Sequence, residues 1–76
     1  MTGARDQSPP QRYCFRVRGR LGETMLSAFP ALHATASGAD TVLTGRLADR
    51  AAVHGVLAVI EALGLELLEV RRLPPG

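Results

Sequence analysis

The chain has 76 residues, enough for a single domain, and its nine basic and seven acidic residues give a formal net charge of +2. That charge is too small to predict nucleic-acid binding. No stretch approaches the ~20 apolar residues of a membrane-spanning helix, and the start of the chain lacks the apolar centre of a secretory signal. Cys14 is the single cysteine, so no internal disulfide can form, and we expect a reduced, cytoplasmic protein.

All nine basic residues are arginine. One explanation is compositional drift, since the chain is rich in alanine, glycine, leucine and arginine. The other is selection for the planar guanidinium group, which binds phosphate or carboxylate through two parallel hydrogen bonds. The composition leaves both explanations open.

Both ends of the chain differ in composition from the middle. Residues 1–11 are polar, contain a Pro-Pro pair and lack an apolar run, so we expect a disordered tail. Residues 74–76 form a second short tail. A single domain over residues 12–73 remains, and a domain this small often gains stability by pairing with a copy of itself.

The pattern of apolar residues predicts six elements in chain order. Residues 12–21 alternate between apolar and polar positions, which predicts a strand. Residues 22–30 favour a short helix that ends at Pro30. A hairpin is predicted next, with strands at residues 32–37 and 41–47 and a turn at 38–40.

A long helix is predicted from about residue 50 to residue 63, with Asp49 as its N-terminal cap and Gly64 as its end. Residues 65–73 form the last strand, with Leu68 and Val70 facing inward. This order predicts a ferredoxin-like α+β fold, βαββαβ, in which a four-stranded antiparallel sheet carries one long and one short helix on one face.

Residues 41–70, TVLTGRLADRAAVHGVLAVIEALGLELLEV, carry a motif that resembles a family of short, uncharacterised bacterial proteins. The family pattern is similar to T-x-L-x-G-x-(L/V)-x-D-x-A-A-x-H-G-x-L-x-x-(I/V)-x-x-L-G-L-x-L. The matching positions are Thr41, Leu43, Gly45, Leu47, Asp49, Ala51, Ala52, His54, Gly55, Leu57, Ile60, Leu63, Gly64, Leu65 and Leu67. The resemblance implies a shared fold and brings no activity with it.

The predicted long helix presents three faces. A broad apolar face is expected to cover the sheet; its large members are Val53, Val56, Leu57, Ile60 and Leu63. Arg50, His54 and Glu61 lie together on a polar strip that holds no serine, cysteine or aspartate nucleophile. We therefore expect His54 to be a surface residue, and we expect no enzyme activity.

A third stripe consists of small residues, Ala51, Gly55, Ala58 and Ala62, at helical spacing. A glycine inside a helix costs about 1 kcal/mol relative to alanine. One interpretation is that this stripe lets a second subunit approach closely. The alternative is that alanine is simply a common and favourable helix residue.

The sheet face opposite the helices is expected to be rich in arginine. Alternation assigns to it Cys14, Arg16, Arg18, His33, Thr35, Val42, Thr44, Arg46, Leu67, Glu69 and Arg71. Arg16, Arg18, Arg46 and Arg71 are the candidate residues for binding an anionic ligand or partner, although a second sheet or solvent are alternative neighbours. Tyr13 and Phe15 share the opposite parity, so this face lacks the aromatic platform that binds RNA.

Two scattered histidines and one cysteine predict neither a metal site nor a cofactor. The sequence therefore predicts a non-enzymatic protein–protein interaction module that forms a homodimer. The alternative is a small-molecule-binding regulatory domain, similar to amino-acid-sensing ACT domains, that uses the arginine-rich face or a turn containing Gly19 and Gly22. An enzyme that encloses its ligand against the sheet ranks third.

Overall fold

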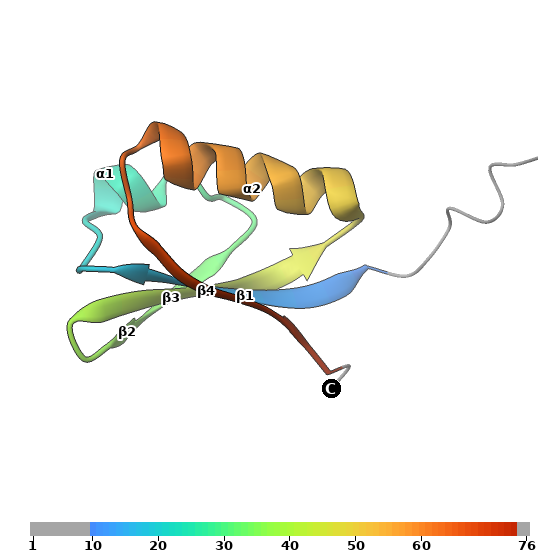
Figure 1. Cartoon of the computed structure of the whole chain (residues 1–76), viewed down its shortest axis with the longest axis horizontal. Coiled ribbons are helices and arrows are strands. Elements are labelled where there is room, and N and C mark those ends of the chain that lie inside the picture. Colours follow the sequence, from blue (N-terminus) through green and yellow to red (C-terminus); the bar gives the residue numbers. More distant parts are fainter. Residues whose placement is uncertain (1–9, 75–76) are drawn as a thin grey trace, which may run out of the picture.

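The computed structural model describes residues 10–74, so the tails expected at residues 1–9 and 75–76 lie outside the described part. Six elements follow one another in the predicted order (Figure 1). They are β1 (Gln11–Arg18), α1 (Glu23–Leu26), β2 (His33–Ser37), β3 (Asp40–Leu47), α2 (Arg50–Ala62) and β4 (Leu67–Leu73). Gln11 pairs with Leu47, so the expectation that residue 11 belongs to a tail is wrong.

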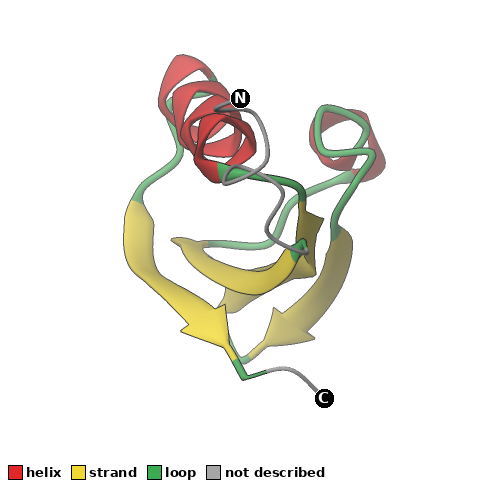
Figure 2. Cartoon of the chain, turned by 90° about the vertical axis from the view of Figure 1, so that its right-hand side faces the viewer, coloured by secondary structure: helices red, strands yellow, loops and turns green. Residues whose placement is uncertain are grey.

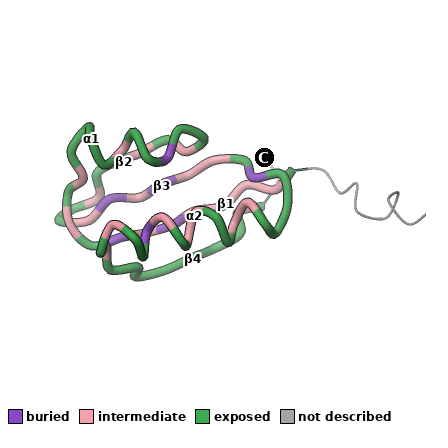
Figure 3. Tube along the Cα trace, turned by 90° about the horizontal axis from the view of Figure 1, so that it is seen from above, coloured by how far each residue is buried: buried purple, intermediate pink, exposed green. Residues whose placement is uncertain are grey.

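The four strands form one antiparallel sheet in the order β2-β3-β1-β4. Both helices lie on the same side of this sheet (Figures 1 and 2). Seen from the helix side, α2 runs along β1 and β4, whereas α1 lies at the β2 end (Figure 3). The predicted α+β class, with an open four-stranded antiparallel sheet and two helices, is confirmed.

The core lies between the sheet and the helices. Its buried side chains come from the two central strands, the segment after α1 and the last turns of α2. They are Phe15, Val17, Phe29, Leu43, Leu47 and Ile60. Phe15 and Val17 are fully buried, as the alternation in β1 predicted, because both point from the central strand toward the helices.

Local signals define both ends of α2. The backbone N–H of Ala52 donates to Oδ1 of Asp49 at 2.9 Å, which satisfies one of the free donors at the helix start. Gly64 follows the helix with a φ of 73°, a left-handed conformation that glycine adopts without a steric penalty. Both predictions are confirmed.

The start of β4 departs from strict alternation. The pairing between β1 and β4 shifts between Arg16 and Val17, so that Arg16 lies opposite Glu69 whereas Val17 lies opposite Leu67. The extra residue is a β-bulge, which reverses the side that preceding residues face. Leu67 therefore lies on the helix side, and its predicted place on the open face is wrong.

Candidate functional site

Arg16 lies in the middle of the open sheet face and is already engaged by its own chain. One guanidinium nitrogen lies 3.3 Å from Oδ2 of Asp40, and the other donates to Oγ of Ser37 at 3.3 Å. Asp40 and Ser37 flank the turn between β2 and β3. This guanidinium therefore ties the central strand to the edge of the sheet.

Two more of the predicted binding arginines form ion pairs near β4. Nε of Arg18 lies 2.9 Å from Oε1 of Glu66, and Nε of Arg71 lies 3.4 Å from Oε2 of Glu69. All four side chains remain more than half exposed, so each pair contributes little to stability. The carboxylates nevertheless reduce the positive potential that an anion would meet there.

Arg46 is the fourth predicted binding arginine, and it is exposed on β3 directly opposite Arg12 of β1. Neither guanidinium forms an ion pair with a carboxylate of residues 10–74. Like charges directly opposite each other destabilise a sheet. Arg12 was not among the predicted binding residues, although its parity with Cys14 and Arg16 places it on this face.

The stripe of small residues on α2 is exposed. This holds for Ala51, Gly55, Ala58 and Ala62, and a Cβ added to Gly55 would meet no atom within 4 Å. Its role as an interface stays a prediction.

The polar strip of α2 lies at the surface. Arg50, His54 and Glu61 are exposed, as predicted for a surface strip. Across residues 10–74, no three side chains among histidine, cysteine, aspartate and glutamate are grouped so that they could hold a metal ion.

The two aromatic residues of β1 lie on the helix side, as predicted. The Tyr13 and Phe15 rings stack there with their centroids 6.4 Å apart. The open face therefore receives no aromatic side chain from β1.

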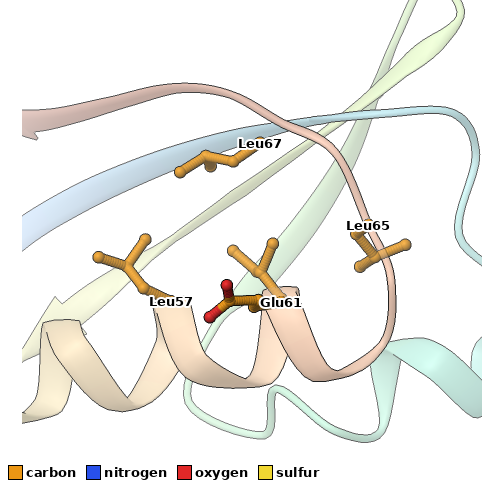
Figure 4. Close-up of a pocket in the computed structure, with 5 residues that line it drawn as sticks. Leu57, Glu61, Leu65 and Leu67 are labelled. Atoms are coloured by element: carbon orange, nitrogen blue, oxygen red, sulfur yellow. The ribbon is translucent and has the colours of Figure 1, made fainter.

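An apolar surface lies where α2 passes over β4. Leu67, Leu68 and Val70, here called the β4 apolar surface, keep 37–38% of their accessible area. Beside it lies an open pocket of about 300 Å³ between the C-terminal half of α2 and the start of β4 (Figure 4). The pocket is lined by Leu57, Ile60, Glu61, Leu65 and Leu67. Leu68 and Val70 were predicted to face inward, and their exposure was not predicted.

The glycine-containing turn after β1 is held by a buried hydroxyl group. Oγ1 of Thr41 donates to the carbonyl of Gly19 at 2.7 Å and accepts from the N–H of Leu21 at 3.3 Å. Gly19 has a φ of 92°. The Thr41 hydroxyl thus holds the backbone on both sides of Arg20. The positive φ of Gly19 allows the chain to turn at this point.

The motif residues of β3 have structural roles. Thr41 holds the preceding turn, Leu43 and Leu47 belong to the core, and Asp49 caps α2. A Cβ on Gly45 would lie only 2.5 Å from the carbonyl oxygen of Ala31. Gly45 is therefore required because the segment after α1 crosses β3 at this point.

The family model described as "Domain of unknown function (DUF8691)" matches residues 12–71. No curated protein and no solved structure matches the chain. Neither helix within residues 10–74 has the length and apolar character needed to cross a membrane.

Proposed function

We propose that this chain, which belongs to the family of the domain of unknown function DUF8691, is a non-enzymatic interaction module that assembles as a homodimer. The observation that carries the proposal is the β4 apolar surface. Three large aliphatic residues of a seven-residue edge strand keep more than a third of their accessible area, next to a largely apolar pocket. Contiguous exposed apolar residues on a small domain mark a surface that another molecule covers.

The small core supports association with a second copy. Only six apolar residues are buried within residues 10–74. A domain of this size buries a modest fraction of its surface on folding, and pairing increases that fraction. Covering the β4 apolar surface would also protect an edge strand whose backbone groups otherwise invite uncontrolled pairing.

A non-enzymatic role is supported by the polar groups of the described chain. Arg16, Arg18 and Arg71 face carboxylates of the same chain, and His54 stands exposed on a strip without a nucleophile. The single polar group of the α2–β4 pocket is the carboxylate of Glu61. One carboxylate among leucines and an isoleucine offers no pair of groups for acid–base catalysis.

We extend the proposal to the fold and the cellular setting. The antiparallel order β2-β3-β1-β4, with both helices on one side, supports a ferredoxin-like arrangement. The free thiol of Cys14 supports a reducing, cytoplasmic environment.

The test of the homodimer is the absolute mass in solution. Size exclusion with light scattering across a concentration series, with and without reductant, is expected to give twice the chain mass of 8.1 kDa in both conditions. A monomer at all concentrations contradicts the proposal. A dimer that reductant abolishes is a disulfide through Cys14, and it also contradicts the proposal.

The Arg12–Arg46 pair favours a second candidate function, binding of a small anionic ligand on the open sheet face. Two guanidinium groups directly opposite each other repel until an anion bridges them. The probes are inorganic phosphate and succinate in a thermal-unfolding assay. The expected result is a stabilisation by the anion that Arg46→Ala removes and that Arg50→Ala, on α2, retains. Equal responses of both variants contradict this candidate.

A further inference from the structure

We propose that the homodimer forms through β4, which pairs antiparallel with the β4 of a second copy so that Val70 lies on the two-fold axis. The two four-stranded sheets then become one continuous sheet. This inference rests on the proposed homodimer and names its interface. Two observations support it: the direction in which the backbone N–H and C=O groups of β4 point, and the order of charged residues along the strand.

The free edge of β4 presents the backbone groups of alternate residues. The N–H of Arg18 donates to the carbonyl of Glu66 at 2.9 Å, so Arg18 directs its backbone groups from β1 toward β4. Because backbone groups alternate in direction along a strand, Arg16 and Cys14 do the same. Their partners on β4, Glu69 and Arg71, direct their groups back toward β1. The groups of Val70 and Arg72, which alternate with them, therefore face outward.

Antiparallel pairing about Val70 matches this outward pattern. Val70 exchanges both backbone hydrogen bonds with the partner's Val70. Val70 is also the midpoint of β4, Leu67–Leu73, so all seven residues of both strands overlap. Glu69 then lies opposite the partner's Arg71, and Arg71 lies opposite the partner's Glu69. These two pairs occupy non-hydrogen-bonded positions, where opposed Cα atoms are about 4.5 Å apart and side chains are closest.

Other two-fold centres on β4 lose this charge match. A centre at Glu69 sets two glutamates opposite each other, and a centre at Arg71 or Arg72 sets two arginines opposite each other. A centre at Leu68 places Glu69 opposite the partner's Leu67, so no Glu69–Arg71 pair forms. Opposite charges directly across a sheet stabilise it and like charges destabilise it, so the sequence of β4 selects the centre at Val70.

The same pairing covers the β4 apolar surface. Val70 lies opposite Phe15 and faces the helix side, whereas Glu69 and Arg71 lie opposite Arg16 and Cys14 on the open face. Two copies joined at Val70 bring the two Val70 side chains together beneath the two α2 helices. On the same side Leu68 lies opposite the partner's Arg72, whose aliphatic stem can cover it. The ion pairs between Glu69 and Arg71 form on the open face.

The opposite edge of the sheet lacks these features. β2 has five residues, and its sequence, HATAS, contains no arginine, aspartate or glutamate. A second copy placed there would find no charge pattern to define a register. The second copy is therefore assigned to the β4 edge.

Charge reversal tests the interface. Glu69→Arg and Arg71→Glu each replace two attractive cross-strand pairs with two repulsive ones, and each is expected to raise the dimer dissociation constant about tenfold or more. Mixing the two variants is expected to restore dimerisation as a heterodimer, because each strand then meets its charge complement. Glu23→Arg in α1 and Arg50→Glu in α2 are controls with the same charge changes, and both are expected to leave the dissociation constant unchanged. The readout is mass against concentration.

A cross-link tests the register without reversing a charge. Val70→Cys in a Cys14→Ser background places two thiols on the axis, where opposed Cα atoms about 5.5 Å apart permit a disulfide. Oxidation is expected to yield a covalent dimer, with Thr35→Cys on β2 in the same background remaining uncross-linked. If the wild-type chain dimerises and neither charge reversal changes the dissociation constant, the β4 interface is wrong while the homodimer stands. The same holds if the Val70→Cys dimer does not cross-link. A monomeric wild-type chain overturns both.

Discussion

The two halves of the helix-facing side of the sheet are covered to different extents. Over β3, the segment after α1 buries Phe29 and brings the carbonyl of Ala31 against Gly45. Over β4, by contrast, Leu67, Leu68 and Val70 remain exposed. The difference teaches that the segment after α1 closes the β3 half of this side, whereas α2 passes over β4 and leaves its apolar side chains partly exposed.

The largest expected effect lies in the closed half. Phe29→Ala removes a buried aromatic ring from the core and is expected to lower the free energy of unfolding by about 3–5 kcal/mol. Urea titration at one fixed protein concentration measures this loss. Met25→Ala, in the neighbouring α1 and exposed, is the control with an expected small effect. A loss for Phe29→Ala as small as the control's would contradict the description of this half as closed.

Gly45→Ala tests the close approach itself. The added methyl group would press against the Ala31 carbonyl and Leu32, and overpacking of this kind costs about 1–3 kcal/mol. The same urea titration is the measurement. Unchanged stability would mean that the segment after α1 does not lie on β3.

Gly55→Ala is the matched substitution on the exposed stripe of α2, and its expected sign is opposite. A Cβ meets nothing within 4 Å there, and alanine favours a helix by about 1 kcal/mol over glycine. The free energy of unfolding is therefore expected to rise. A decrease, seen above the concentration at which dimers form, would show that a second subunit packs against this stripe.

The smallest loss of stability in the isolated chain is expected in the open half. Leu68 is partly exposed, so Leu68→Ser should lower the free energy of unfolding, measured below the dimer dissociation constant, by about 1 kcal/mol. The dimer dissociation constant should rise, because the paired strands lose apolar contact. A large loss of stability in the monomer would instead place Leu68 in the core.

The order and type of the elements could be predicted because their signals are local. The alternation around Phe15 and Val17, the cap at Asp49 and the stop at Gly64 each depend on a few neighbouring residues. The exposure of the β4 apolar surface depends instead on how α2 packs across the sheet. Tertiary packing determines that exposure, and the periodicity of the sequence does not predict it.

The candidate site was predicted less completely for two reasons. The alternation of side chains between the two faces of β4 is interrupted at the bulge, and only the pairing with β1 defines where the extra residue lies. Leu67 was therefore predicted on the wrong face. Gly45 and Gly55 belong to the same motif, yet only Gly45 has a neighbour that requires glycine. A residue's identity alone did not distinguish these two roles.

The bulge at the start of β4 makes this point of the chain tolerant of a change in length. Removing one of Leu67 and Leu68 would restore regular pairing with Val17, while Glu69, Val70 and Arg71 would keep their partners on β1. The pocket beneath the end of α2 would lose a leucine or be reshaped. A single-codon deletion here would therefore alter the pocket and leave the rest of the sheet in register, so the pocket and the charged residues of β4 could be changed independently.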